Sequence, residues 1–226
     1  VYVGDGNQSG FKQKTTFSPS TIGYGHGNCP RYWFLAFEGA EFEEKFDAMA
    51  RANMENGKYA HDRIQAKMEK TGLVEALEKE VKSEDPPIRG FIDVILKDGT
   101  IGEIKTTKEE VYLHKQSSMK PSSNHLLQIL TYMKLRDAKY GFVFYENKND
   151  QGYLIIPVTM NASNEDLINK TFDWMRKVYA NWQNKTLPTR PFNKIGSPCV
   201  YCPIKRDCWK ERGEGEIDIE ILKVPK

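Results

Sequence analysis

The segment from Asp93 to Lys105 constrains this chain most, because it reads as a tight hairpin that brings two carboxylates together. Two apolar runs flank Lys97-Asp98-Gly99-Thr100, a sequence typical of a hairpin turn. In a paired hairpin Asp93 and Glu103 lie near each other, and Lys105 faces the same side as Glu103. Two converging carboxylates repel each other unless a cation lies between them. Hard oxygen ligands favour Mg²⁺ or Mn²⁺, and such sites typically act on phosphates.

The same hairpin also fits a segment without chemistry, because Asp, Glu and Lys are common on a solvated face. A string of the form D…E-x-K is short enough to arise by chance. The residues around the hairpin therefore decide between a charged surface and a cation site.

Length and composition favour a single domain over residues 1–226, with its core at about 40–185, because 39% of the residues are hydrophobic. No apolar run is long enough to span a membrane, and the N-terminus lacks the pattern of a signal peptide. We therefore expect a soluble intracellular protein with no membrane partner. The formal net charge of +2 neither requires nor excludes nucleic acid.

The spacing of the apolar residues predicts alternating helices and short strands. We expect helix starts at 18–20 and 29–31, and a helical region over 32–70 that Gly57 divides into two helices. Residues 73–81 fit either the end of a helix or a strand. The remaining expectations are an extended arm over 1–20, the hairpin over 91–106, a loop over 117–124, helices over 125–136 and 164–184, strands over 140–145 and 153–158, and an edge strand over 216–222. This order is typical of the α/β (or α+β) class, with a mixed central sheet flanked by helices.

Three further motifs accompany the hairpin, and each lies on an element of the expected type. They are Gly57-x-x-x-His61 on a helix, Gly90-Phe-Ile-Asp93 on the first hairpin strand, and Gln128-x-x-x-Tyr132 on one face of a later helix. Together with Glu103-x-Lys105, and in this order over 57–132, they closely resemble the RecB-like branch of the PD-(D/E)XK nuclease superfamily. The resemblance implies a restriction-endonuclease-like core.

The resemblance also implies a role for each motif residue at the cation. Asp93, Glu103 and the main-chain carbonyl of Ile104 would be metal ligands, and His61 would complete the set. Imidazole is more usual with Mn²⁺ than with Mg²⁺. The metal would lower the pKa of a bound water and polarise the scissile phosphate, while Lys105 would orient the attacking hydroxide or offset charge on the phosphate.

The implied activity is metal-dependent hydrolysis of DNA. Gln128 and Tyr132 would contact the nucleic-acid strand near the scissile bond. The absence of a GxxxxGK[ST] phosphate loop favours a stand-alone nuclease over a helicase–nuclease. The resemblance implies an exonuclease acting on single strands or DNA ends, in phage or bacterial recombination, repair or CRISPR-type processing, in the cytoplasm of a bacterial, archaeal or phage-infected host cell. Protein partners from such pathways and a homo-oligomer both fit. A structure-specific endonuclease on the same core and a non-catalytic DNA-binding protein are the alternatives.

Four cysteines form a second constellation. Cys199, Cys202 and Cys208 lie close together in the sequence, and Cys29 lies far upstream. In a cytoplasmic protein the Cys-x-x-Cys spacing is more typical of a metal or redox centre than of a disulfide. We expect a module of about 21–35 and 190–212, in which the N-terminal cysteine closes a C-terminal metal cluster.

This arrangement of one plus three cysteines looks like the iron–sulfur nucleases of the RecB-like branch, which include CRISPR-associated adaptation exonucleases and the AddB subunit. The resemblance implies a [4Fe–4S] cluster as a structural clip. Structural zinc is the alternative, because four thiolates are equally good zinc ligands. His26 could replace a cysteine ligand, and the aromatic residues near the cysteines are expected to shield the centre: Tyr24, Tyr32, Trp33, Tyr201 and Trp209.

Overall fold

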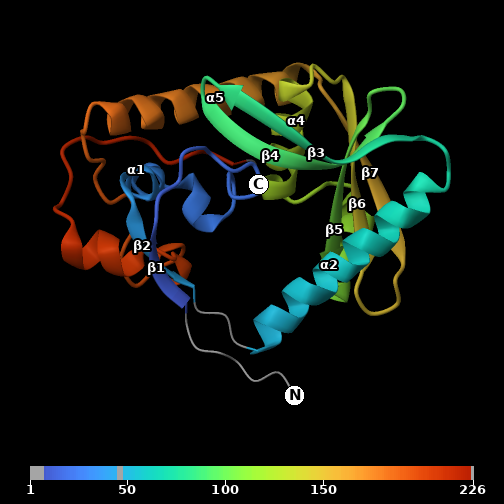
Figure 1. Cartoon of the computed structure of the whole chain (residues 1–226), viewed down its shortest axis with the longest axis horizontal. Coiled ribbons are helices and arrows are strands. Elements are labelled where there is room, and N and C mark those ends of the chain that lie inside the picture. Colours follow the sequence, from blue (N-terminus) through green and yellow to red (C-terminus); the bar gives the residue numbers. More distant parts are fainter. Residues whose placement is uncertain (1–7, 45–47, 225–226) are drawn as a thin grey trace.

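The computed structural model describes residues 8–44 and 48–224. A five-stranded sheet lies at its centre, in the order β3-β4-β5-β6-β7 (Figure 1). The strands are β1 (Gln8–Lys12), β2 (Ala40–Glu44), β3 (Val74–Glu84), β4 (Pro87–Leu96), β5 (Ile101–Thr107), β6 (Tyr140–Asn147) and β7 (Tyr153–Thr159). The helices are α1 (Pro30–Glu38), α2 (Ala48–Glu69), α3 (Glu109–Ser118), α4 (Ser123–Leu135) and α5 (Ala162–Gln183), with short turns η1 (Gly25–Asn28), η2 (Cys199–Tyr201) and η3 (Asp207–Glu211).

The central sheet is mixed, which confirms the predicted fold class. Strands β5 and β6 are parallel, and the other neighbouring pairs are antiparallel. Strands β4 and β5, both fully described, pair at just two positions, Val94–Gly102 and Ile95–Ile101. Beyond them the β3–β4 ribbon turns away from the rest of the sheet (Figure 1). Asp93 and Glu103 are next in this register, so they lie where the two strands separate.

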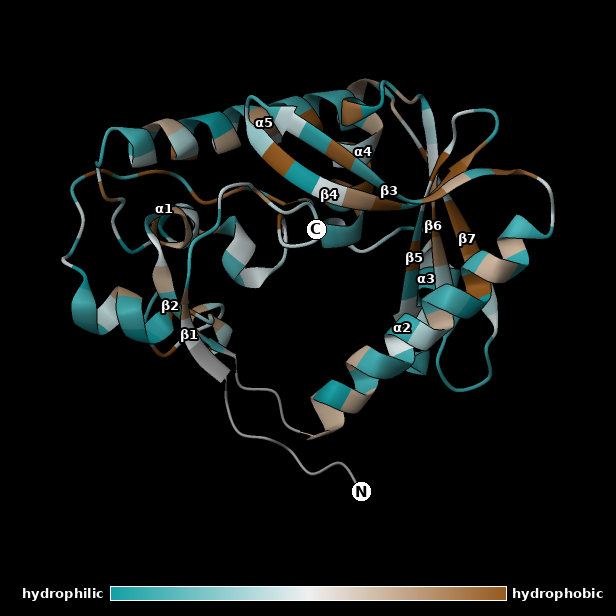
Figure 2. Cartoon of the chain, viewed as in Figure 1, coloured by the Kyte–Doolittle hydropathy of each residue, from teal (hydrophilic) through white to brown (hydrophobic). Residues whose placement is uncertain are grey.

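Helices cover both faces of the sheet. Helix α4 packs on β5 and β6 and against α5, whereas α2 crosses β3 and β5. Successive residues of β5 face opposite ways: Glu103 contacts α4, and Ile104 packs on Ile64 of α2. Figure 2 shows hydrophobic colour on parts of β4 and β7 and mostly polar residues along α2. In the described part of the chain, no helix is long and apolar enough to cross a membrane.

The expectation of one helical region over 32–70, divided at Gly57, is wrong. Helix α1 ends at Gly39, whose φ of 88° is left-handed and favours glycine. Strand β2 follows and pairs antiparallel with β1, and α2 then runs through Gly57 without a break. Phe42 lies on β2 and is buried like the aromatic residues of α1. The regular spacing of aromatic residues therefore continues from the helix into the strand and does not reveal where the helix ends.

Several other expectations are corrected. Residues 18–20 form a turn, in which the N–H of Ile22 donates to the carbonyl of Ser18, and no helix starts there. Residues 109–118 form α3, which shortens the expected loop over 117–124. The tail over 216–222 forms no strand; Ile217 makes one isolated bridge to Pro188. Part of the expected N-terminal arm, residues 1–7, lies outside the described residues.

The other elements agree with the sequence. Helix α1 begins after Cys29, with Pro30 in its first turn, and 73–81 is resolved as strand β3. Helices α4 and α5 match the expected spans 125–136 and 164–184, and β6 and β7 contain the expected strands. In these segments the apolar residues recur at regular intervals, or a capping residue marks where a helix begins.

Candidate active site

The diverging strands β4 and β5 form a cleft of about 480 Å³. Its wall contains every residue whose side chain the sequence assigns to the cation or its surroundings: His61, Asp93, Glu103, Lys105, Gln128 and Tyr132. The N-terminal segment over 16–20 closes one side, where Phe17 pairs with Ile88 at the free edge of β4. Four separate elements, α2, β4, β5 and α4, therefore deliver the predicted residues to one place.

Asp93 and Glu103 are held by donors from the sheet and from α4. The backbone N–H of Ile104 donates to Asp93 Oδ2 at 2.7 Å. Glu103 Oε1 accepts from Gln128 Nε2 at 2.7 Å and lies 2.6 Å from Lys105 Nζ. Glu103 Oε2 is buried and has no hydrogen-bond partner among the described residues. Burial of a carboxylate oxygen without a partner costs free energy, and a cation bound at this atom would offset that cost.

The pKa values of the two carboxyls reflect this burial. Burial, followed by the charge of Asp93, raises the pKa of Glu103 to about 8, although Lys105 lowers it. Burial also raises the pKa of Asp93, against the lowering effects of His61, the Ile104 N–H and Lys105. A divalent cation would stabilise both ionised forms.

A third acidic residue, Glu78, joins this site, although the sequence motifs do not predict it. Ligand atoms of His61, Glu78 and Asp93 lie within 4.8 Å of one another, which is close enough for one metal ion. Glu78 has a left-handed φ of 47° and lies between the paired positions Leu77–Val94 and Lys79–Ile92, opposite Asp93. Strand β3 contains four glutamates, so the sequence does not distinguish Glu78 from the others. Its left-handed backbone conformation does.

Glu80, the acidic neighbour singled out from the sequence as a solvated charge, differs from Glu78. Its carboxylate forms ion pairs with two exposed side chains, Arg89 at 2.6 Å and Lys82 at 2.9 Å. The interpretation of Glu80 as a solvated charge agrees with these exposed partners.

Helix α2 is held against the sheet by polar contacts as well as by a small apolar face. Gln65 is buried, and its Nε2 donates to Glu78 Oε1 at 2.6 Å and to the Asp93 carbonyl at 3.0 Å. One turn earlier, His61 Nδ1 lies 3.8 Å from Asp93 Oδ2. Arg63 Nη2 lies 2.8 Å from both carboxylate oxygens of Glu146 on β6. These contacts explain how a largely polar helix places an imidazole at the cleft.

Gly90 and Tyr132, from two different motifs, pack directly on each other. A Cβ at position 90 would lie 2.8 Å from the Tyr132 ring and 3.1 Å from Pro19. Tyr132 is 3% exposed and Gln128 is 5% exposed, so both are buried beneath the cleft surface. Their contacts in this structure are with the site itself: Tyr132 with Gly90, and Gln128 with Glu103.

A family model for the PD-(D/E)XK nuclease superfamily matches residues 38–209. The chain belongs to this superfamily. Its motif residues, brought together at one cleft from four elements, therefore lie in a nuclease core. None of the curated proteins matches this nuclease.

The solved structures of one exonuclease, with and without dAMP, share the fold of this nuclease. The alkaline exonuclease LHK-Exo from Laribacter hongkongensis has a TM-score of 0.57 at 12% identity, covering 75% of this chain and 91% of its own. Its complex with dAMP matches with the same TM-score at 14% identity, over 75% and 89% of the two chains. A phage-related exonuclease from Haemophilus somnus 129PT has a TM-score of 0.42 at 11% identity, over 58% and 72%.

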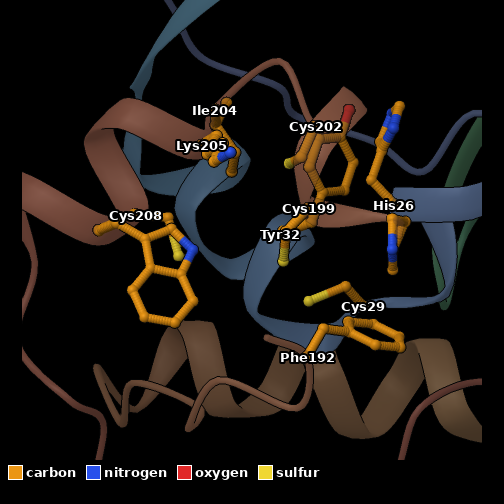
Figure 3. A pocket seen from close by; sticks show the side chains of 11 residues that line it. His26, Cys29, Tyr32, Phe192, Cys199, Cys202, Ile204, Lys205 and Cys208 are labelled. Carbon is orange, nitrogen blue, oxygen red and sulfur yellow. The ribbon is translucent and has the colours of Figure 1, made fainter. Parts of the chain in front are cut away.

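The four cysteines of the nuclease line one small cavity, although Cys29 is distant in sequence (Figure 3). Each sulfur has a nearby N–H donor. The backbone N–H groups of Tyr32 and Arg31 lower the pKa of Cys29, that of Ile204 lowers the pKa of Cys202, and the Trp209 indole lowers the pKa of Cys199, each against the larger effect of burial. Arg31 Nε donates to Cys208 Sγ at 3.2 Å. Such donors stabilise a thiolate that ligates a metal. The residues present therefore fit a metal–thiolate centre.

Burial dominates the pKa values of the metal-free thiols. It raises the pKa of Cys29 to about 12, against the lowering by the Tyr32 N–H, and it raises the pKa of Cys199 and of Cys202. Among the described residues, no three cysteine sulfurs lie within 4.8 Å of one another. A single tetrahedral zinc with Zn–S bonds of about 2.3 Å needs sulfurs about 3.8 Å apart.

The aromatic residues around the cysteines divide into two groups. Tyr32 and Trp33 are buried, which agrees with the expected shielding, and Trp209 is half-buried beside the cavity. Tyr24 is 59% exposed and Tyr201 is 82% exposed, so the expected shielding is wrong for these two. His26 also lines the cavity, and burial lowers its pKa to about 4.

Proposed function

We propose that this chain is a Mg²⁺- or Mn²⁺-dependent DNA exonuclease of the RecB-like branch, acting on single strands or DNA ends. The unpartnered, buried Glu103 Oε2 beside Asp93 carries the proposal, because a cation would stabilise the ionised form of this pair. Asp93, Glu103, the Ile104 carbonyl and His61 would hold it, and we add Glu78 to these ligands. The ligand atoms of His61, Glu78 and Asp93 already lie within 4.8 Å of one another, whereas Glu103 belongs to no such group of three among the described residues. A bound ion would supply a water of lowered pKa and would polarise the scissile phosphate.

The protein's own side chains orient the reaction. Lys105 lies 2.6 Å from Glu103 Oε1 and is partly exposed to the cleft, so its ammonium group can hold the attacking water or offset charge on the phosphate. Gln128 holds Glu103 in place, and Tyr132 packs under Gly90. We therefore assign Gln128 and Tyr132 to positioning the site, in place of the strand contact that the family resemblance implies.

The fold of LHK-Exo supports exonuclease activity, and its complex with dAMP supports a deoxynucleotide product of the same class. A test compares end-labelled linear DNA with a covalently closed circle. We expect linear DNA to be degraded from its ends and the circle to survive. Cleavage of the circle would favour the alternative, a structure-specific endonuclease.

Lys105→Ala tests the catalytic assignment, with exposed Lys108→Ala as the matched control. We expect Lys105→Ala to abolish cleavage while DNA binding, measured with Ca²⁺, is retained. Lys108→Ala should cleave normally. Full activity in Lys105→Ala would contradict the mechanism, and a wild-type protein that binds DNA without cleaving it would favour the non-catalytic alternative.

We further propose a [4Fe–4S] cluster on Cys29, Cys199, Cys202 and Cys208, as a structural clip. The wide separation of the sulfurs supports a cluster over a single zinc ion. Anaerobically purified protein should be brown, with iron and acid-labile sulfide. A colourless protein with stoichiometric zinc would contradict the iron–sulfur assignment.

The single-domain organisation over 1–226, the cysteine module of about 21–35 and 190–212, and a cytoplasmic location belong to the same proposal. The buried core supports the first of these, because one cluster of packed residues extends from Phe17 to Leu222. Protein partners in recombination or CRISPR adaptation, and a homo-oligomer, are compatible with the proposed activity.

A further inference from the structure

Arg31 is a buried cation beside the cysteine cavity. Its side chain lies in the first turn of α1 and is 1% exposed. The guanidinium donates to the carbonyls of Pro188, Gly213 and Glu214, and its Nε donates to Cys208 Sγ at 3.2 Å. Among the side chains that the structure describes, those of residues 10–43 and 48–224, no carboxylate forms an ion pair with it. Its positive charge therefore lacks a conventional counter-ion in the described part of the chain.

A buried charge is stable when an opposite charge lies close to it. Carbonyl dipoles supply part of the compensation, but the Cys208 sulfur is the contacting atom that can carry a full negative charge. A neutral thiol is a weak acceptor, whereas a metal-bound thiolate is anionic. The position of Arg31 is thus best explained by a site that is anionic when it is filled.

We propose that Arg31 is the charge partner of an anionic metal–thiolate centre on the four cysteines, and that its hydrogen bond to Cys208 strengthens metal binding there. This inference rests on the proposed metal centre, but it does not depend on which metal is present. Four thiolates around a zinc ion and four thiolates around a [4Fe–4S]²⁺ core both carry a net charge of about −2. Arg31 offsets part of this charge inside the protein.

Arg190 provides a matched control, because it makes similar structural contacts without the sulfur contact. Its side chain is 9% exposed, and it donates to the carbonyls of Cys208, Arg212 and Gly213. Unlike Arg31, it has a carboxylate partner, Glu214, at 2.7 Å. Both arginines bind the Gly213 carbonyl, so both tie the same segment to the module. The charge contact with a cysteine distinguishes Arg31.

The experiment measures metal content in the anaerobically purified full chain, and then Cd²⁺ binding after demetallation under reducing conditions. Thiolate-to-Cd²⁺ charge-transfer absorption reports the affinity in wild type, Arg31→Met, Arg31→Lys and Arg190→Met. We expect Arg31→Met to weaken Cd²⁺ binding by about 10- to 100-fold, Arg31→Lys to recover part of the loss, and Arg190→Met to stay within about threefold of wild type.

Melting temperatures separate a charge partner from a structural clamp. A ligand stabilises the folded protein by an amount that rises with the logarithm of its affinity, so the gap in Tm between Cd²⁺-loaded and metal-free protein reports the coupling. We expect this gap to shrink in Arg31→Met and to persist in Arg190→Met. Equal gaps in the two variants, or equal Cd²⁺ affinities, would overturn the role of Arg31 while leaving the centre intact.

If a variant does not survive demetallation, the as-isolated protein provides a second measurement. For an iron–sulfur cluster, loss of a nearby positive charge disfavours reduction, so Arg31→Met should lower the reduced-to-oxidised ratio about tenfold at a fixed potential, equivalent to about 59 mV. Arg190→Met should leave the potential unchanged. An unchanged potential in Arg31→Met would overturn the proposal, and wild-type protein that binds no metal or Cd²⁺ would overturn the centre itself.

Discussion

The Tyr132 ring lies so close to Gly90 that a Cβ at position 90 would be 2.8 Å from the ring. The glycine ahead of Asp93 and the tyrosine after Gln128 are therefore two sides of one contact. The aromatic ring supports the backbone of β4 three residues before the candidate metal ligand. This contact links α4 to the position of Asp93.

We predict that Gly90→Ala destabilises the protein by about 1–3 kcal/mol, because the added methyl group overpacks against a buried ring. Urea unfolding of wild type and variant measures the change. Gly10→Ala is the matched control, since a Cβ there meets no atom within 4 Å. Equal unfolding midpoints for wild type and Gly90→Ala would contradict the packing argument.

Gln128→Leu should reduce Mn²⁺ affinity or cleavage rate by about 10- to 100-fold, since the amide orients Glu103 Oε1 at 2.7 Å. Calorimetric titration with Mn²⁺ and single-turnover cleavage measure the two effects. A role in strand contact instead predicts normal Mn²⁺ affinity with weakened DNA binding. That combination would restore the role implied by the family resemblance.

Glu78→Gln tests the added ligand. Because Glu78 has a ligand atom within 4.8 Å of those of His61 and Asp93, its neutralisation should weaken Mn²⁺ binding by about tenfold. Glu80→Gln on the same strand is the control and should bind Mn²⁺ normally, since Glu80 pairs with Arg89 and Lys82. Similar affinities for the two variants would remove Glu78 from the site.

The raised pKa of Glu103 predicts a pH dependence with a definite sign. In the metal-free protein this carboxyl has a pKa of about 8, against its ordinary value of 4.5. Its favourable contribution to folding is fully present below about pH 4.5 and is lost as the pH rises through about 8. Metal binding requires the ionised form, so Mn²⁺ affinity should rise over the same interval and level off above about pH 8.

Two measurements check this dependence. Chemical unfolding of the metal-free proteins should show wild type losing stability relative to Glu103→Gln as the pH rises across that interval, and Mn²⁺ titrations of wild type should show affinity increasing. Glu103→Gln, which does not ionise at this position, should bind Mn²⁺ weakly at every pH. A stability difference that changes with pH in the opposite direction would exclude a raised pKa at Glu103.

The parts of the site that the sequence predicts are those with a local pattern. Asp93, Glu103 and Lys105 belong to one short hairpin, and the period of two places them on predictable faces. Gln128 and Tyr132 are one helical turn apart, so their shared face follows from helix geometry. The ordered motifs then identify the superfamily, which the match over 38–209 confirms.

Other features depend on contacts between distant segments. Glu78 reaches the cleft because its backbone is left-handed at one position of β3, and nothing in the surrounding glutamates marks this position. Strand β2 follows α1 without a change in the apolar spacing, and its pairing with β1 identifies it as a strand. Helix α3 has a weakly amphipathic sequence, so its formation is not evident from periodicity.

The sequence by itself determined the chemistry of this protein: the carboxylates, the lysine and the cysteines, with the order and spacing typical of a nuclease. The tertiary structure decided how those groups are used. Divergence of β4 from β5 opens the cleft and buries Glu103 with one oxygen unpartnered, and packing of α4 turns Gln128 and Tyr132 inward. Burial and charge compensation depend on neighbours that are distant in the chain, and spacing alone does not encode them.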